Sequence, residues 1–220
     1  MPDAPPPAAI IFDLDGTLVD TVPARIEAWS ATFEEAGIPS TRGQLGPLIG
    51  MDGVRLALDV TRAAGEAVDA ERAREIDRRA GELFDDINRH PAPLPGARDA
   101  LAMLDRANVT WAIATSSRPE QVAASVDALG LDHEPRIVDG SSVQHAKPAP
   151  DLLLLAAERI GLDPAGLWYL GDSTWDMRAA VAAGMVAVGV LAGAAVTADD
   201  LRAAGAATVL ATLDDLELPE

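Results

Sequence analysis

The chain has 220 residues, 49% of them apolar, which is enough for one large domain or for a core domain with a small second one. Its net charge of −18 excludes nucleic acid and anionic membranes as partners, because both repel an acidic surface. It contains no cysteine, which excludes disulfides and thiolate metal sites and fits a cytoplasmic location.

The first strong pattern is an apolar run over residues 8–12, typical of a buried strand. It ends at two acids one residue apart, Asp13 and Asp15, and Gly16 permits a tight turn after them. Alternation along a strand would place both acids on one face, and burying two carboxylates is costly unless a cation lies between them. A hairpin turn at Asp-Gly is the alternative. Residues 1–9 lack the basic start and apolar core of a signal peptide.

Helical patterns follow this first strand. Asp20 or Thr21 can cap a helix, and apolar side chains then recur at helical spacing: Val22, Ile26, Trp29 and Phe33. Further helices are expected at about residues 41–48, 54–64 and 69–89. Residues 90–96 contain three prolines and form a stiff connector. The pattern predicts a helical second domain over residues 20–93, inserted into a core domain made of residues 1–19 and 94–220.

Strands and helices alternate after the connector. Strands are expected near residues 109–114, 137–138, 167–170 and 185–190, with helices between them. Ser117 to Glu120 has the pattern of a capping box that opens the helix ending at Leu129. Strands separated by helices predict an α/β fold with a parallel sheet covered on both faces.

An uncharged run over residues 179–198 has the length of a membrane span. Gly184 divides it into the end of a helix and a strand, and most of its residues are Ala, Gly and Val. We therefore expect no membrane-spanning segment here.

Chemically active side chains follow the ends of the predicted strands, where open parallel sheets bind their ligands. In chain order these side chains are Asp13, Asp15, Thr115, Ser116, Lys147, Asp172 and Asp176. Lys147 is the only lysine of the chain, against sixteen arginines. An acidic protein that binds an anionic substrate needs local positive charge, which a metal ion, this lysine or backbone N–H groups can supply.

This order resembles the four motifs of the haloacid dehalogenase (HAD) superfamily. They are D-x-D-G-T at Asp13, a small hydroxyl residue at Thr115, the lysine before Pro148, and G-D-S-x-x-D around Asp172. The resemblance spans residues 13–176 and implies a Rossmann-like parallel sheet with an inserted α-helical bundle as a cap. The insertion is similar to the cap of phosphoglycolate phosphatase and β-phosphoglucomutase-like members.

The resemblance also implies the role of each residue. Asp13 would be the nucleophile that forms an aspartyl phosphate, and Asp15 the general acid/base. Mg²⁺ would be held by the carboxylates of Asp13 and Asp172 and the backbone carbonyl of Asp15. Lys147 would pair with Asp13 and the phosphoryl group.

The remaining motif residues would support this centre. The Thr115 hydroxyl and the Ser116 amide would hold phosphoryl oxygens. Asp176 would orient metal-bound water or Lys147. Thr115 and Ser116 could instead cap the next helix, and Asp176 could be a first-turn acid favoured by the helix dipole.

Two cap arginines are candidates for choosing the substrate. Arg55 could bind a substrate carboxylate or a second phosphate, although a solvent-exposed helix arginine is the alternative. Arg25 lies where β-phosphoglucomutases carry a histidine, which leaves its role open.

The expected function is Mg²⁺-dependent hydrolysis of a small phosphorylated metabolite by a monomer or homodimer. A phosphomutase is the alternative on the same scaffold, but the mutases resembled here use a cap lysine, and this cap has none. The same absence disfavours a phosphonatase, and Asp15 disfavours a haloacid dehalogenase. A non-catalytic binding protein is the alternative from another class.

Overall fold

A parallel sheet of six strands forms the centre of the larger part of the molecule. The computed structural model describes residues 6–218. The strand order is β3-β2-β1-β4-β5-β6, and every described strand pair is parallel. The strands are β1 (Ala9–Phe12), β2 (Thr110–Ala114), β3 (Ile137–Val138), β4 (Leu167–Gly171), β5 (Val186–Val190) and β6 (Thr208–Leu210). The predicted α/β fold is therefore confirmed.

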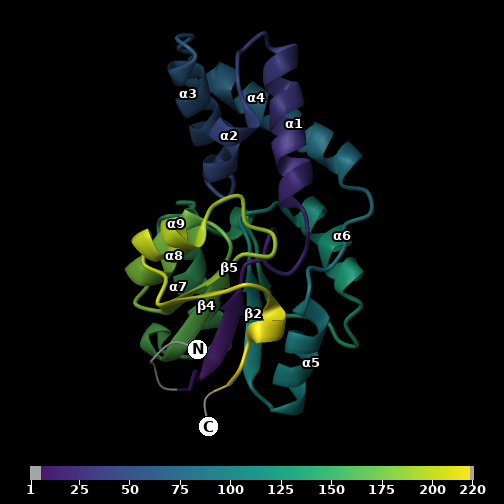
Figure 1. Cartoon of the computed structure of the whole chain (residues 1–220), viewed down its shortest axis with the longest axis vertical. Coiled ribbons are helices and arrows are strands. Elements are labelled where there is room, and N and C mark those ends of the chain that lie inside the picture. The colour runs from purple at the N-terminus through teal and green to yellow at the C-terminus, as the bar shows by residue number, and fades with distance from the viewer. Residues whose placement is uncertain (1–5, 219–220) are drawn as a thin grey trace.

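Helices cover both faces of this sheet (Figure 1). The helices α5 (Ala97–Arg106) and α6 (Pro119–Leu129) pack on one face, together with the short 3₁₀ helix η4 (Leu213–Asp215). The other face is covered by α7 (Asp151–Ile160), α8 (Thr174–Ala182) and α9 (Ala198–Ala203). Two further 3₁₀ helices are η2 (Gly140–Ser142) and η3 (Pro164–Gly166).

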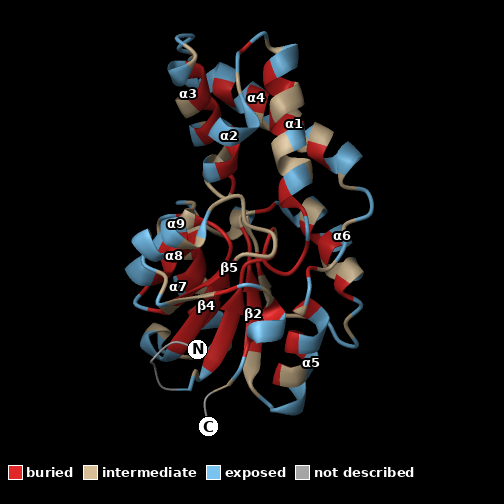
Figure 2. Ribbon diagram, in the orientation of Figure 1, coloured by how far each residue is buried: buried red, intermediate tan, exposed pale blue. Residues whose placement is uncertain are grey.

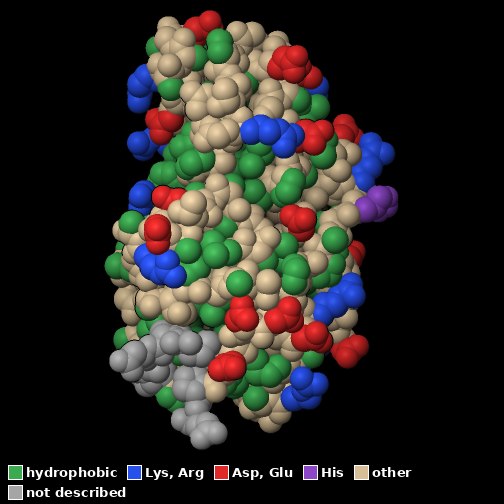
Figure 3. Space-filling model, viewed as in Figure 1, with side chains coloured by type: hydrophobic (Ala, Val, Ile, Leu, Met, Phe, Trp, Pro, Cys, Tyr) green, Lys and Arg blue, Asp and Glu red, His purple; other side chains and the backbone are tan. Residues whose placement is uncertain are grey.

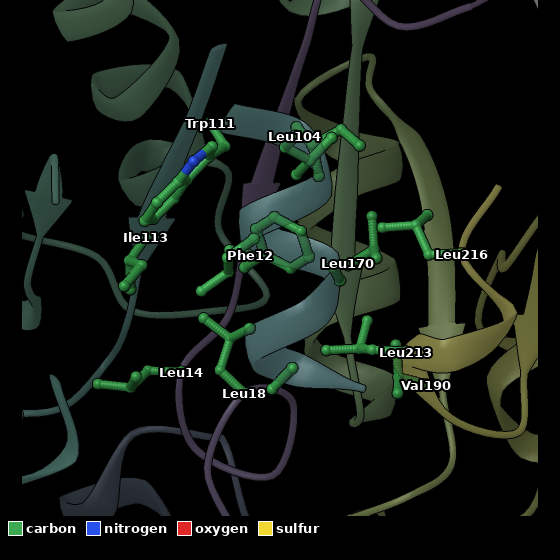
Figure 4. Packing of buried hydrophobic residues seen from close by; sticks show 14 of the residues in the cluster. Phe12, Leu14, Leu18, Leu104, Trp111, Ile113, Leu170, Val190, Leu213 and Leu216 are labelled. Carbon is green, nitrogen blue, oxygen red and sulfur yellow. The ribbon is translucent and has the colours of Figure 1, made fainter. Parts of the chain in front are cut away.

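The central strand β1 is buried on both faces, as its apolar run predicts. Ile10 and Phe12 point into the cluster under α5, whereas Ile11 points into the cluster under α7 and α8. Figure 4 shows Phe12 among Leu104, Leu170 and other labelled side chains. Burying a side chain of this size stabilises the fold by about 1.5–3 kcal/mol, so β1 is a rigid base for the residues that follow it.

The helices between β1 and α5 form the upper part of the molecule in Figure 1. They are α1 (Val22–Glu35), α2 (Arg42–Leu45), the turn η1 (Gly46–Leu48), α3 (Gly53–Ala63) and α4 (Ala70–Ile87). Their apolar faces meet in a cluster of their own, in which Trp29 stacks on Phe33 with ring centroids 5.5 Å apart. Figure 2 shows the same division, with buried faces turned inward and exposed faces outward. We refer to residues 20–93 as the cap.

The cap leaves and rejoins the sheet at neighbouring points. Asp20 N donates to Ala92 O at 2.8 Å, and Leu94 N donates to Leu18 O at 2.9 Å. The two connecting segments therefore run side by side, as expected for an insertion tethered at both ends. The domain boundaries themselves stay a prediction.

The uncharged run over residues 179–198 raised the possibility of a membrane-spanning helix. Within residues 6–218, none of the helices combines the length and hydropathy that crossing a bilayer needs. The uncharged run predicted to divide at Gly184 does so: α8 ends at Ala182, Gly184 has φ +76°, and β5 follows. Figure 3 shows acidic and basic side chains interspersed on the described part of one face, with no continuous basic patch there.

The predicted capping box at Ser117 is wrong, because the N-cap of α6 is Arg118. Thr21 takes the N-cap position of α1 as predicted, but its hydroxyl makes no capping hydrogen bond. Both hydroxyls donate instead to the carboxylate of Asp15. A partly buried carboxylate needs donors, and both hydroxyls are turned toward Asp15 and not toward the backbone N–H groups of the first helical turn.

Two glycines with positive φ provide a test of the packing between η4 and the start of α5. Gly96 has φ +79°, and an added Cβ would lie 2.1 Å from the backbone nitrogen of Asp214. Gly161 has φ +74° with nothing within 4 Å of such a Cβ. We expect Gly161→Ala to lower the free energy of unfolding by about 1–2 kcal/mol through backbone strain alone. Gly96→Ala should cost at least about 3 kcal/mol, because backbone must also shift.

Urea denaturation followed by circular dichroism measures both variants. Equal losses of unfolding free energy would mean that η4 does not pack against the start of α5 in solution.

Candidate active site

The candidate site lies at the carboxyl ends of β1, β2 and β4. The strand order reverses beside β1, and crevices at such reversal points are the ligand sites of open α/β sheets. Asp13, Thr115 and Asp172 each come directly after one of these strands. The parallel register therefore brings them to one edge of the sheet, as the sequence predicts.

A buried ammonium group lies between two of the acids. Lys147 Nζ is 2.6 Å from Asp13 Oδ1 and 2.7 Å from Asp176 Oδ1, and all three side chains are at most 8% exposed. Burial raises the pKa of Asp13 to about 7, although the charge of Lys147 acts in the opposite direction. Burial opposes the charge on Lys147, but the two carboxylates outweigh it and raise the pKa of the ammonium above its ordinary value.

Among the acids of this site, Asp172 has the negative charge that nearby donors and cations balance least. It is 4% exposed and accepts one side-chain hydrogen bond, from Thr17 Oγ1 at 3.3 Å. Burial and the nearby charges of Asp176 and Asp13 hold its pKa well above the usual range. An uncompensated carboxylate at this position favours a cation as its partner.

The acids have the donor set of a metal site. Asp13, Asp172 and Asp176 each offer a carboxylate oxygen, and these oxygens lie within 4.8 Å of one another. Both oxygens of Asp176 already accept hydrogen bonds, Oδ1 from Lys147 and Tyr169 and Oδ2 from Ser173. Asp13 and Asp172 therefore keep more free lone pairs. Hard oxygen donors of this kind suit a divalent cation such as Mg²⁺.

Gly16 is required by the close approach of two loops. It has φ +81°, and a Cβ at this position would lie 2.4 Å from Asp172 Oδ2. An added Cβ on Gly193 would lie 2.4 Å from the Gly16 carbonyl oxygen. The glycine after the two acids thus permits both the turn and the contact with Asp172.

Asp15 is held by donors from both parts of the molecule. Thr21 Oγ1 donates to Oδ1 at 2.7 Å, while Ser117 Oγ and Thr115 Oγ1 donate to Oδ2. Arg25 Nη2 lies 3.7 Å from Oδ2. Burial alone would raise the pKa of Asp15, but the charge of Arg25 and these hydrogen bonds outweigh it and lower the pKa below the usual range.

The loop after β2 presents three consecutive hydroxyl groups. Thr115 is fully buried and its Oγ1 also accepts from Ser117 N at 3.0 Å. The buried hydroxyl of Ser116 has no hydrogen-bond partner within the described part of the chain. An unpartnered buried hydroxyl beside a cavity favours a ligand oxygen as its acceptor.

Ser117 is a site residue that the sequence prediction assigned to helix capping. Its hydroxyl contacts Asp15 and accepts from Arg25 Nη2 at 2.7 Å. The available signal was the unbroken hydroxyl run after a strand end. The nearby proline and glutamate favoured the capping interpretation instead.

A cavity of about 430 Å³ separates this edge of the sheet from the cap. Its cap-side lining includes Arg25, Trp29, Asp52, Asp77 and Phe84. A volume of this order suits a small metabolite.

Polar contacts join the cap to the sheet on both sides of the cavity. Arg118 Nη2 pairs with Asp77 at 2.9 Å, and Gln121 Nε2 donates to Asp85 at 3.0 Å. Trp175 Nε1 donates to Pro47 O at 3.0 Å. The described structure is therefore a form in which the cap lies against the sheet.

The two cap arginines differ in position. Arg25 lines the cavity, with its guanidinium 3.6 Å from the centre of the Phe84 ring. Arg55 pairs with Asp59 at 3.1 Å on an exposed helix face and does not line the cavity. This position fits the alternative interpretation of Arg55, a solvent-exposed helix residue.

Comparison with known proteins identifies the family. The haloacid dehalogenase-like hydrolase model matches residues 7–184. A phosphoglycolate phosphatase from Xanthomonas campestris pv. campestris is 34% identical over 205 residues, covering 88% of this chain and 87% of the relative. The Probable phosphatase IndB of Dickeya dadantii is 33% identical over 217 residues, covering 94% and 90%. The crystal structure of a hydrolase from Pseudomonas syringae matches with a TM-score of 0.89 and 33% identity, covering 94% of this chain and 95% of that chain.

The family match covers the whole stretch from β1 to α8, and with it all four motifs at the strand ends. The relatives also extend over the cap, because they cover most of both chains. This chain therefore belongs to the haloacid dehalogenase-like hydrolases and is a phosphoric monoester hydrolase of that family.

Proposed function

We propose that this chain hydrolyses a small phosphate monoester with Mg²⁺ as its metal, through an aspartyl phosphate on Asp13. The observation that carries the proposal is the bond from Lys147 to one oxygen of Asp13, beside the undercompensated Asp172. Lys147 contacts Oδ1, which leaves Oδ2 of Asp13 available to a phosphorus atom in the cavity. The phosphatase names of the relatives support the same chemistry.

The first half-reaction transfers the phosphoryl group to the protein. A carboxylate oxygen of Asp13 attacks phosphorus, the bond from phosphorus to the ester oxygen breaks, and Asp15 gives its proton to the leaving alcohol. The phosphate dianion opposes the charge of Arg25 and so favours the protonated Asp15 that this step needs. Lys147, the Ser116 hydroxyl and backbone amides of the loop after β2 would hold the phosphoryl oxygens.

The second half-reaction returns Asp13 to its starting state. Asp15, now a carboxylate, takes a proton from water, and the water oxygen attacks the aspartyl phosphate. Inorganic phosphate leaves and Asp15 is protonated again. One residue thus acts in turn as acid and as base.

Mg²⁺ would be held by the carboxylates of Asp13 and Asp172 and by the backbone carbonyl of Asp15. When bound it would offset the repulsion between Asp13 and the phosphate, which for unit charges 4 Å apart is about 4 kcal/mol at an effective dielectric constant near 20. The residues fit such an ion because three buried acids, Asp13, Asp172 and Asp176, and the partly buried Asp15 face only two basic groups, Lys147 and Arg25.

Phosphomutase activity finds less support. Transfer back to a sugar needs the same aspartyl phosphate, but the lysine used by the mutases resembled here is absent from residues 20–93. The only lysine of the chain already pairs with Asp13 and Asp176. Hydrolysis is therefore the better-supported outcome.

Asp13→Asn tests the nucleophile. Removing it should lower turnover of p-nitrophenyl phosphate at least about 10³-fold in the presence of Mg²⁺, because an amide cannot form the intermediate. EDTA should abolish wild-type turnover and added Mg²⁺ should restore it. Mass spectrometry of rapidly quenched wild-type protein should detect a phosphorylated Asp13.

Asp199→Asn is a matched control, because this acid is 94% exposed and far from β1 in the chain. It should keep wild-type turnover. Activity that persists in Asp13→Asn or in EDTA would refute the proposed mechanism.

Asp172→Asn tests the undercompensated charge by a stability measurement. The folded pKa of Asp13 is about 7 against an ordinary 3.8, so the metal-free protein binds more protons folded than unfolded. The contribution of Asp13 to stability is therefore fully present below about pH 4 and is lost as pH rises through about 7. Asp172→Asn removes one of the repelling charges, so its melting temperature in EDTA at pH 7.5 should exceed that of wild type by about 2–6 °C.

Asp176→Asn provides the contrast. It weakens an acceptor whose four hydrogen bonds are already satisfied, so it should lower the melting temperature in EDTA. Mg²⁺ should raise the melting temperature of wild type, with a much smaller rise in Asp172→Asn. An Asp172→Asn protein that melts below wild type in EDTA would show that the charge of Asp172 is compensated.

A further inference from the structure

We infer, on the basis of the proposed phosphatase function, that Trp175 is a positioning residue for the part of the cap that faces the leaving group. That part is the segment over residues 46–53, which runs from η1 to the start of α3. The indole of Trp175 holds this segment over the cavity, and the segment then forms a wall that a leaving group contacts.

The segment over residues 46–53 supplies much of the cap-side wall of the cavity. Its lining residues are Ile49, Gly50, Met51, Asp52 and Gly53. Asp13, the proposed nucleophile, lines the same cavity from the sheet side. A leaving group that extends from a phosphoryl group at Asp13 toward the cap therefore meets this segment, whose position sets the room that the leaving group has.

The cap itself fixes only parts of this segment. Ile49 packs in the apolar cluster of the cap, and the Asp52 side chain caps α3 by accepting from a backbone N–H. Three of the eight residues are glycines, which have no side chain with which to pack. The position of the segment over the cavity therefore depends on contacts with the sheet domain as well.

Trp175 supplies a directional contact from the sheet domain. Its Nε1 donates to the carbonyl oxygen of Pro47 at 3.0 Å. The backbone turns of the segment use the neighbouring carbonyls, those of Gly46 and Leu48, so the Pro47 carbonyl is left for the indole. Because a hydrogen bond weakens steeply when it is lengthened or bent, this bond fixes both the distance and the direction of the segment.

Two close approaches lie on either side of Pro47. A Cβ on Gly50, which has φ +93°, would lie 2.9 Å from Ser173 Oγ. A Cβ on Gly46 would lie 3.3 Å from the Cβ of Ala195, in the loop after β5. The segment thus lies directly against the sheet domain, and the absence of side chains at these two positions lets the Pro47 carbonyl reach the indole.

The first turn of α8 is a firm base for the indole. Ser173 and Asp176 form a reciprocal capping box around Trp175, and Asp176 also accepts from Lys147. Asp172, the acid with the least balanced charge, immediately precedes this turn. The wall that faces the leaving group and the acids that face the phosphoryl group are therefore held by the same helical turn.

Trp175→Phe tests the inference, because it removes the indole donor and keeps an aromatic ring at a half-buried position. The test compares p-nitrophenyl phosphate, which has a long aromatic leaving group, with methyl phosphate, whose leaving group has one carbon, both with Mg²⁺. The kcat/KM for p-nitrophenyl phosphate should fall about 3–10-fold, mainly through a higher KM, as expected for the loss of one hydrogen bond. The kcat/KM for methyl phosphate should stay within about 2-fold of wild type, because its leaving group is too short to reach the segment.

Trp111→Phe is the matched control. Trp111 Nε1 also donates one hydrogen bond, to Asp105 Oδ1 at 2.8 Å, but Trp111 does not line the cavity or contact the segment. This variant should keep the wild-type kcat/KM for both esters. Hydrogen exchange of the Mg²⁺-loaded protein, followed by mass spectrometry, gives a readout besides activity: the amides of residues 46–53 should exchange at least about 3-fold faster in Trp175→Phe and at the wild-type rate in Trp111→Phe.

An unchanged kcat/KM for p-nitrophenyl phosphate in Trp175→Phe would overturn the inference. Equal losses for the two esters would overturn it too, since Trp175 would then act on the neighbouring acids and not through the cap. Unchanged exchange over residues 46–53 would overturn it whether or not either ester is hydrolysed. If wild type hydrolyses neither ester while exchange over residues 46–53 rises as expected in Trp175→Phe, the proposed phosphatase function fails, whereas the positioning of the segment by Trp175 is supported.

Discussion

The ammonium group of Lys147 makes the rest of the site possible. It lies within 2.7 Å of two buried carboxylates, and without it the acids gathered at the end of β1 would repel one another in a poorly solvated space. One ammonium group cannot neutralise all of these carboxylates. Asp172 and Asp13 are left with too little positive charge nearby, and their pKa values are raised. The charge that destabilises the metal-free fold is the charge that would attract a divalent cation.

The stability of the sheet offsets the cost of gathering these charges in one place. β1 lies between β2 and β4 and is apolar on both faces, so burial of its side chains fixes where its last residue ends. Asp13, Asp15 and Asp172 lie in the loops beyond β1 and β4, and Asp176 lies in the first turn of α8, so none of them interrupts a strand. Stability thus comes from the strands and chemistry from the loops.

The sequence was sufficient for the residues whose position depends on strand ends, such as Asp13 and Asp172, because parallel register brings those ends together whatever lies between them. It was misleading for Ser117, because a local capping pattern and a long-range bond to Asp15 use the same hydroxyl. Arg25 and Arg55 look alike in the sequence, as arginines on amphipathic helices. Only the packing of α1 against α6 and Phe84 separates the residue that lines the cavity from the one that faces solvent.

Asp15 contacts both the cap and the sheet domain. Its oxygens accept hydrogen bonds from Thr21 at the entrance to the cap and from Ser117 on the sheet side, and Arg25 supplies the positive charge beside it. Any displacement of α1 relative to the sheet therefore changes both the charge and the donors that Asp15 faces. The position of the cap and the protonation of the residue proposed as general acid cannot vary independently.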